Sequence, residues 1–284
     1  MNTKLQFGDF ETELTTWENS RVVILPAPFD ATSTWIKGSD KGPAALLDAS
    51  YNLEFYDIET DSEVYKGGIF TDTPLECGCC PEKMSGDVKA KIASYIDAGK
   101  FAVTIGGEHS VSIGAIQAHC GKYDNVTVLQ LDAHSDLRQE YHGSKYNHAC
   151  VMARAAEIAP ILQVGIRSMD ICEKPYMNTE NVFFAKDIHG RTDWIDSLCS
   201  KLTENVYITI DLDAFDSSIM PSTGTPEPGG MGWWQVLTLL KAVAQKANIV
   251  GFDIVELCPN EHNKAPDFLA AKLLYKLLTY KFEL

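Results

Sequence analysis

The feature that most limits the fold of this chain is a series of short apolar runs, each long enough for one β-strand and separated by stretches long enough for a helix. The runs are continuously apolar, which is typical of strands buried on both faces of a sheet. The clearest runs are Val22–Leu25, Phe101–Ile105, Val126–Leu131, Ile161–Val164, Val182–Ala185, Val206–Ile210 and Ile249–Ile254, with a weaker one at Ile69–Thr71.

The intervening stretches carry helical periodicity. In Pro81–Gly99, apolar residues recur every four positions from Met84 to Ile96, and the closing glycine suits a helix C-terminus. Further helices are expected at Val111–His119, Trp194–Leu202, Trp233–Lys246 and Asp267–Tyr280. Alternating strands and helices predict an α/β protein with a mostly parallel sheet covered by helices. No repeat or linker-like change of composition interrupts the pattern, so residues 1–284 are interpreted as a single domain.

Charge and composition exclude several classes of function. Lys and Arg number 24 against 39 Asp and Glu, a formal charge of −15. Nucleic-acid and anionic-membrane partners are therefore not expected, because both require a basic face. The acidic N-terminus does not resemble a signal peptide, and no window reaches the roughly 18 apolar residues of a membrane helix. The eight cysteines lie partly within apolar patterns, which favours reduced thiols and a cytoplasmic location.

Polar clusters follow four of the apolar runs, at the point where each run ends. The residues of interest are His109 after the run 101–105, Asp132, His134 and Asp136 after 126–131, Asp211 and Asp213 after 206–210, and Glu256 after 249–254. In a parallel sheet the C-terminal ends of the strands share one edge, where ligands bind. We therefore expect these side chains to converge in one crevice.

The types and spacing of these residues indicate a metal centre. In extended backbone, residues two apart point the same way, so Asp-x-His-x-Asp and Asp-x-Asp each place their side chains on one side. A single aspartate at a strand end is often a helix N-cap, but so many carboxylates in one crevice would repel one another unless cations neutralised them. Two histidines and four aspartates suit two divalent ions, with Mn²⁺ preferred, and such a pair can activate a shared water.

At these residues the chain resembles the ureohydrolases, the arginase and agmatinase family. The matching segments are LPAPFDATSTWIKGSDKGPAALLDAS (25–50), GGEHS (106–110), LDAHSDLR (131–138), ITIDLDAFD (208–216), PSTGTPEPGG (221–230) and GFDIVEL (251–257). The resemblance implies a three-layer α/β/α fold on an eight-stranded parallel sheet, two Mn²⁺ ions per subunit, and homotrimers or homohexamers. Glu108 and Ser217 depart from the family pattern, in which many members have Asp and Pro.

The resemblance also implies a role for each site residue. One metal would be held by His109, Asp132, Asp136 and Asp211, and the other by Asp132, His134, Asp211 and Asp213. Asp136 would in addition orient the attacking hydroxide, Glu256 would pair with the substrate guanidinium, and His148 would carry a proton to the leaving amine.

The expected substrate is a small cationic guanidino compound. The loop that follows the Asp-x-His-x-Asp motif, residues 137–155, resembles the agmatinase version, which predicts hydrolysis of agmatine to putrescine and urea, with Glu140 as a partner for its amine. Guanidinobutyrate would instead need a cation such as Arg138 or Lys145 for its carboxylate. An arginase, a formiminoglutamase and a catalytically silent regulator with this fold remain alternatives.

Two further patterns have competing interpretations. Cys77, Cys79 and Cys80 indicate a surface loop with oxidisable thiols rather than a zinc site, since no second pair with zinc spacing accompanies them. A (β/α)₈ barrel also fits the length and the alternation of elements, but the His-x-His that such metal-dependent barrels place on an early strand does not occur.

Overall fold

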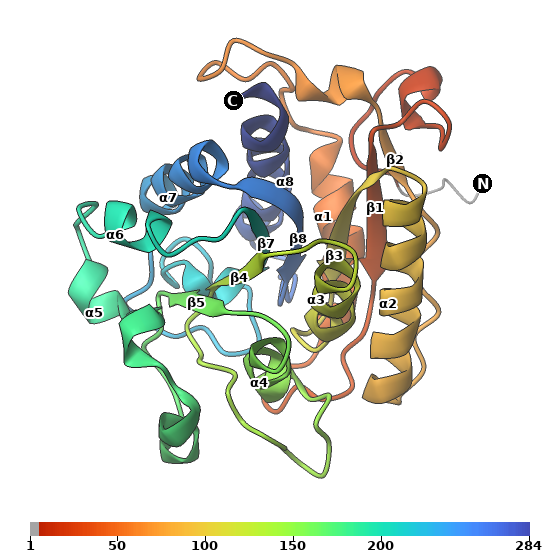
Figure 1. The fold of residues 1–284 in the computed structure, drawn as a ribbon. Coiled ribbons are helices and arrows are strands. Elements are labelled where there is room, and N and C mark those ends of the chain that lie inside the picture. Colours follow the sequence, from red (N-terminus) through yellow and green to blue (C-terminus); the bar gives the residue numbers. More distant parts are fainter. Residues whose placement is uncertain (1–5) are drawn as a thin grey trace.

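The computed structural model describes residues 6–284, and an open, twisted sheet runs through its centre (Figure 1). The strands are β1 Val22–Ala27, β2 Ile69–Thr71, β3 Phe101–Gly106, β4 Val126–Leu131, β5 Ile161–Val164, β6 Val182–Phe183, β7 Asn205–Asp211 and β8 Asn248–Val255. Their order is β2-β1-β3-β8-β7-β4-β5-β6, and every neighbouring pair is parallel. The expected parallel sheet is confirmed, and because β2 and β6 form its two edges the sheet is not a closed barrel.

Helices cover both faces of this sheet (Figure 1). They are α1 Gly42–Ser50, α2 Pro81–Asp97, α3 Val111–Cys120, α4 Val151–Ala156, α5 Ala185–Ile188, α6 Ile195–Cys199, α7 Trp233–Lys246 and α8 Ala265–Glu283. Short 3-10 helices lie at Thr12–Thr15, Ser39–Lys41, Val64–Gly67, His148–Cys150, Ile171–Tyr176, Thr179–Asn181 and Leu212–Ala214. Within residues 6–284, no helix combines the length and apolar character that crossing a bilayer requires.

The two apolar layers explain why the strand sequences do not alternate. Helices α1, α6, α7 and α8 contribute to one buried cluster, and α2, α3 and α4 to the other. In β1, Val22 and Ile24 belong to the first cluster, whereas Val23 and Leu25 belong to the second. Each strand therefore buries both of its faces, and the expected three-layer α/β/α arrangement is confirmed.

The sequence prediction was wrong in detail at one strand and incomplete for the helices. The run expected to be extended to Ala185 ends at Phe183, because Ala185 begins α5. The helices α2, α3, α6, α7 and α8 lie where helices were expected, whereas α1, α4 and α5 were not predicted.

The four strands that carry the polar clusters are neighbours in the middle of the sheet, in the order β3, β8, β7, β4. Gly107, directly after β3, allows the loop that follows to pass close to the β1 end. Its amide donates to Ala27 O at 2.9 Å, and a β-carbon there would lie 2.1 Å from Phe29 O. A side chain at Gly107 would therefore displace the loop that carries Glu108 and His109.

Candidate active site

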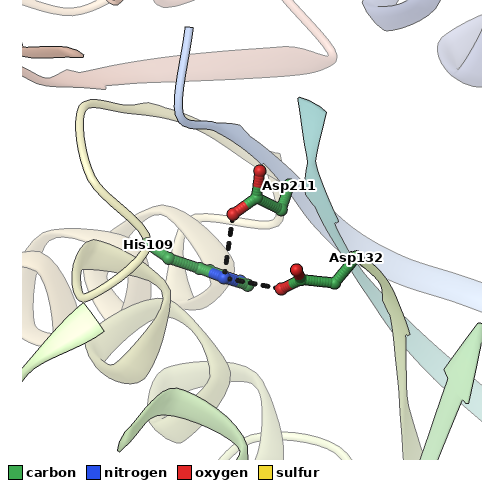
Figure 2. A group of neighbouring side chains, drawn as sticks. All are labelled: His109, Asp132 and Asp211. Atoms are coloured by element: carbon green, nitrogen blue, oxygen red, sulfur yellow. Dashed lines mark ion pairs between the residues drawn. The ribbon is translucent and has the colours of Figure 1, made fainter. Parts of the chain in front are cut away.

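The structure brings all six residues expected to bind metal into two overlapping groups at the C-terminal sheet edge. In the first group, His109 Nδ1 lies 3.1 Å from Asp132 Oδ2, 2.9 Å from Asp136 Oδ2 and 3.4 Å from Asp211 Oδ2. Figure 2 shows His109 with Asp132 and Asp211, whose side chains come from three separate stretches and point toward one another.

The second group is built around His134. Its Nδ1 lies 3.0 Å from Asp213 Oδ2 and 3.6 Å from Asp132 Oδ1. Asp132 is therefore common to both groups, one oxygen facing each histidine. Two ligand groups that share a carboxylate are the arrangement expected of a two-metal centre.

An unpaired buried atom indicates that the first group is suited to a cation. His109 Nδ1 is buried and has no hydrogen-bond partner, although three carboxylates surround it. Its other ring nitrogen, Nε2, lies 2.9 Å from Thr209 Oγ1. A bare imidazole nitrogen among carboxylate oxygens is a donor set that a divalent ion of intermediate or hard character accepts.

Backbone and amide donors hold the carboxylates in place. Asp132 Oδ1 accepts from the His134 amide at 2.6 Å, and its Oδ2 accepts from Gln130 Nε2 at 2.7 Å. Asp213 Oδ1 accepts from the Ala133 amide at 3.0 Å. Because each of these oxygens is fixed by an atom of the fold, the ligand groups are organised before any ion binds.

The charges in this cluster are mutually unfavourable without cations. Burial, reinforced by repulsion from Asp132, raises the pKa of Asp136 to about 7. Burial and repulsion from Asp213 and Asp132 likewise raise the pKa of Asp211 well above its usual range. Burial alone would lower the pKa of His134, but Asp213 and Asp132 together raise it. Metal cations bound between these carboxylates would relieve the repulsion without the carboxylates having to take up protons.

Two of the expected catalytic residues have left-handed backbone conformations, Asp136 with φ 50° and Glu256 with φ 67°. Such conformations cost about 1–3 kcal/mol each in residues other than glycine and persist only where the surroundings hold them. The Asp136 carbonyl accepts from the amides of Met152 and Ala153 in the first turn of α4, and the Glu256 amide donates to Gly107 O at 2.7 Å. These bonds aim both carboxylates into the site.

A cavity of about 300 Å³ opens above the two ligand groups. The expected site residues that line it are His109, His134, Asp136, His148, Asp211 and Glu256. Asp132 and Asp213 do not line the cavity, and both are buried.

The residue expected to bind the guanidinium, Glu256, and the residue expected to transfer a proton, His148, both have shifted pKa values. Burial and the charge of Glu108 raise the pKa of Glu256 to about 8, and Glu256 Oε1 accepts from the His109 amide at 2.7 Å. Burial and the positive charge of His109 and His134 lower the pKa of His148 to about 4. His148 is therefore neutral near pH 7. A cationic partner would stabilise the ionised form of Glu256.

The model of the arginase family matches residues 20–279. The chain belongs to the arginase family. An N(1)-aminopropylagmatine ureohydrolase of Synechocystis is 38% identical over 97% of this chain and 93% of its own, and one of Thermus thermophilus is 37% identical over 98% and 95%. The agmatine ureohydrolase structure of Thermoplasma volcanium has a TM-score of 0.86 and 32% identity, with 95% and 93% covered.

This arginase-family protein is thus a ureohydrolase, an enzyme that acts on guanidino compounds. An agmatinase of Pyrococcus horikoshii is 31% identical over 96% of both chains. The sequence-based identification of the family is confirmed, and the alternative of a catalytically silent regulator loses its support.

The mouth of this ureohydrolase's cavity contains residues that sequence reasoning missed. Tyr141, Met169, Asp170 and Glu173 line it. Glu173 is buried and accepts from Ser135 Oγ at 2.7 Å and the Leu137 amide at 2.8 Å, which fixes the loop after β4. The available signal was the spacing Asp170-x-x-Glu173, which forms a capping box at the start of the 3-10 helix 171–176.

The residues suggested for the far end of the substrate are placed differently from expectation. Neither Glu140 nor Lys145 is among the residues that line the cavity, and both are exposed. Arg138 does line it, but its Nη2 lies 3.2 Å from Asp170 Oδ2 and its guanidinium stacks 4.4 Å from the centre of the Tyr141 ring. The positive charge of Arg138 is therefore already paired with the carboxylate of Asp170.

The three clustered cysteines lie outside this site. Cys79 and Cys80 are exposed, Cys77 is half-buried, and burial raises the pKa of Cys77 to about 11. Across residues 6–284, the groups with metal-binding geometry contain only histidine and aspartate.

Proposed function

We propose that this ureohydrolase hydrolyses the guanidinium group of N(1)-aminopropylagmatine, with agmatine as the shorter alternative substrate. Hydrolysis releases urea and leaves a polyamine, which is putrescine if the substrate is agmatine. The names of the Synechocystis and Thermus relatives support the longer substrate, whereas the sequence alone favoured agmatine. Both substrates carry a guanidinium at one end and at least one amine cation at the other.

The observation that carries this proposal is the charge of the cavity. Apart from the proposed metal ligands, its walls include the carboxyl groups of Asp170, Glu173 and Glu256, and the arginine that lines it, Arg138, is paired with Asp170. A substrate with an α-carboxylate or a terminal carboxylate would meet these acids without a free cation to receive it. A substrate that is cationic at both ends meets favourable charge throughout its length.

We propose Mn²⁺ as the ion at both positions, with the ligand sets expected from the family: His109, Asp132, Asp136 and Asp211 for one, and Asp132, His134, Asp211 and Asp213 for the other. The donor set is rich in carboxylate oxygens and lacks thiolates, which supports Mn²⁺ over a thiolate-type zinc centre. When bound, two such ions would supply a water acidic enough to act as a nucleophile near neutral pH.

The chain's own residues would then bind, orient and transfer protons. Glu256 receives the N–H groups of the guanidinium, and its oxygen that is not bonded to the His109 amide is free for this contact. Asp136 accepts a hydrogen bond from the attacking water and so fixes its direction. As the water adds to the guanidinium carbon, His148 accepts one of its protons, and when the C–N bond to the alkyl chain breaks, His148 gives that proton to the leaving nitrogen so that it departs as a neutral amine.

Urea release measured side by side from several substrates tests this proposal. Purified protein reconstituted with Mn²⁺ would be given N(1)-aminopropylagmatine, agmatine, arginine, guanidinobutyrate and formiminoglutamate, with ammonia or formamide release followed for the last. We expect the highest kcat/KM with N(1)-aminopropylagmatine, then agmatine, and values at least about 100-fold lower for the carboxylated compounds, since two unpaired charge contacts cost roughly 3 kcal/mol. An equal or higher kcat/KM with arginine or guanidinobutyrate would contradict the assignment.

A further inference from the structure

We propose that Glu108, acting through Thr32, is a positioning residue that fixes the tautomer and orientation of His148; this rests on the proton-transfer role proposed for His148 above. The two residues come from distant parts of the chain. Thr32 lies in the loop after β1, and Glu108 lies in the loop after β3.

Glu108 is fully buried and is bonded almost entirely to the loop that carries Thr32. It accepts from the amides of Thr32 at 2.6 Å and Ser33 at 2.9 Å, and from the hydroxyls of Thr32 at 2.5 Å, Ser110 at 2.6 Å and Ser33 at 3.4 Å. Amide N–H groups can only donate, so the Glu108 side chain is an acceptor on this side. The arrangement is that of a carboxylate that holds one loop in a fixed position.

The single hydroxyl proton of Thr32 decides the direction of the next hydrogen bonds. That proton goes to Glu108 Oε1, a carboxylate oxygen that accepts it at 2.5 Å. The Thr32 oxygen also lies 3.1 Å from the His148 amide nitrogen and 3.0 Å from His148 Nδ1. Since Thr32 has no second proton to give, its oxygen accepts from both, and Nδ1 must carry a hydrogen.

His148 is therefore held with Nδ1 protonated and Nε2 left as the nitrogen that exchanges protons. The ring lines the cavity and meets the Tyr141 ring edge-on, with 6.2 Å between centroids and 83° between planes. Nε2 would take a proton from the water that adds to the guanidinium carbon and give it to the leaving nitrogen. Throughout this transfer, the Nδ1–H group would keep its hydrogen bond to the Thr32 oxygen. The chain Glu108–Thr32–His148 thus does for this histidine what a carboxylate does for a catalytic imidazole in other enzymes.

A set of variants separates this role from simple support of the loop. Thr32→Val removes the hydroxyl and keeps the branched shape, and Thr32→Ser restores the hydroxyl. We expect kcat of Thr32→Val to fall about 10–100-fold, part of the 10²–10⁴ that proton transfer supplies, with KM and bound metal within about twofold of the original protein. Thr32→Ser should retain kcat within about threefold.

Ser33→Ala is the matched control, because it removes a hydroxyl that donates to the same carboxylate, whereas the hydrogen bonds of His148 in this chain of residues go to Thr32. It should leave kcat within about twofold. Wild-type kcat in Thr32→Val, or an equal loss in Thr32→Ser and Thr32→Val, would overturn the proposal. So would a rise in KM at unchanged kcat, which would indicate a binding role.

A second measurement does not depend on catalysis and so distinguishes failure of this inference from failure of the proposed function. In ¹⁵N-histidine-labelled protein loaded with diamagnetic Mg²⁺, long-range ¹H–¹⁵N correlation spectra report which ring nitrogen is protonated, and His148→Asn identifies the signals. We expect Nδ1–H for His148 in the original protein and a mixture of tautomers in Thr32→Val. A dominant Nε2–H tautomer in the original protein would refute the inference, whatever substrate the enzyme uses.

Discussion

Thr209 is expected to set the affinity of the metal position that contains His109. Its hydroxyl donates to Asp253 Oδ1 at 2.7 Å, and its oxygen lies 2.9 Å from His109 Nε2. Asp253 is fully buried and also accepts from Tyr207 Oη at 2.5 Å. As the Thr209 proton is committed to Asp253, its oxygen must accept from Nε2–H, which leaves Nδ1 bare toward the carboxylates.

The substitution Thr209→Val removes that acceptor and keeps the side-chain volume. The Nε2–H group of His109 would then be buried without a partner, at a cost of about 1–3 kcal/mol. The opposite tautomer, with the proton on Nδ1, avoids this cost but blocks the ligand atom. We therefore expect the affinity of one ion to fall about 10–100-fold, or roughly 1.4–2.7 kcal/mol, the range typical of a lost outer hydrogen bond to a ligating histidine.

Competition between the protein and a chelating dye for Mn²⁺ measures the two affinities separately. The ion held by His134 should be unaffected, because Thr209 touches only the His109 side of the centre. Thr104→Val is the matched control: Thr104 pairs with Asp253 across the β3–β8 register, but its buried hydroxyl has no hydrogen-bond partner. Unchanged affinity in Thr209→Val, or an equal loss in Thr104→Val, would refute the reasoning.

Three further predictions concern the surface near α7 and α8. Lys276→Met should destabilise the protein by about 3–5 kcal/mol in urea unfolding, because Asp57 and Lys276 are a buried pair 2.9 Å apart and the buried carboxylate would lose this cation; a loss below about 1 kcal/mol would contradict this. Burial would raise the pKa of Glu59, but Lys241 and Lys276 lower it to about 2, so it stabilises the fold above pH 4.5 and this is lost as the pH falls toward 2; Glu59→Gln should flatten that acid limb in thermal melts. Trp234 is 74% exposed beside an apolar hollow, and we propose that the expected homo-oligomer forms there; Trp234→Asp should shift light scattering to a smaller species, and an unchanged mass would exclude this surface.

The sheet could be predicted because both faces of its strands are buried, so each strand is a continuous apolar run in the sequence. β6 was overestimated because its apolar run Val182–Ala185 continues into α5, and only two of its residues pair with β5. Helix α4 was missed for a different reason. It has only six residues, and the amides of Met152 and Ala153 near its start donate to the carbonyl of Asp136. This tertiary contact leaves no periodic pattern in the sequence.

The ligand residues could be predicted from strand ends, whereas the mouth of the cavity could not. Strand ends place side chains by rule, since neighbouring parallel strands end at one edge. Asp170 follows β5, whose end carries no ligand, and its pairing with Arg138 joins two loops whose approach depends on how Glu173 binds the Ser135–Leu137 segment. Such loop-to-loop contacts are set by the folded backbone and are not visible in the spacing of residues.

The same strand-end geometry predicts that metal contributes to stability as well as to catalysis. Four aspartates, Asp132, Asp136, Asp211 and Asp213, share one buried cluster with only two histidines, and burial together with repulsion raises the pKa of Asp136 and Asp211. An ion that binds only the folded chain stabilises it by about 2.7 kcal/mol at 100 times its Kd, or roughly 4–5 °C in Tm for a chain of this size.

Thermal melts of chelator-treated protein, with and without added Mn²⁺, measure this gain directly. Asp211→Asn removes a proposed ligand of both ions and one buried charge, so its metal-free form should melt at or above the original metal-free protein, while its gain on adding Mn²⁺ should be smaller. A metal-free Asp211→Asn protein that melts well below the original would show that this carboxylate stabilises the fold on its own. In that case the arrangement of acids at the sheet edge would not be maintained at the expense of stability, and metal binding would not be the reason for their convergence.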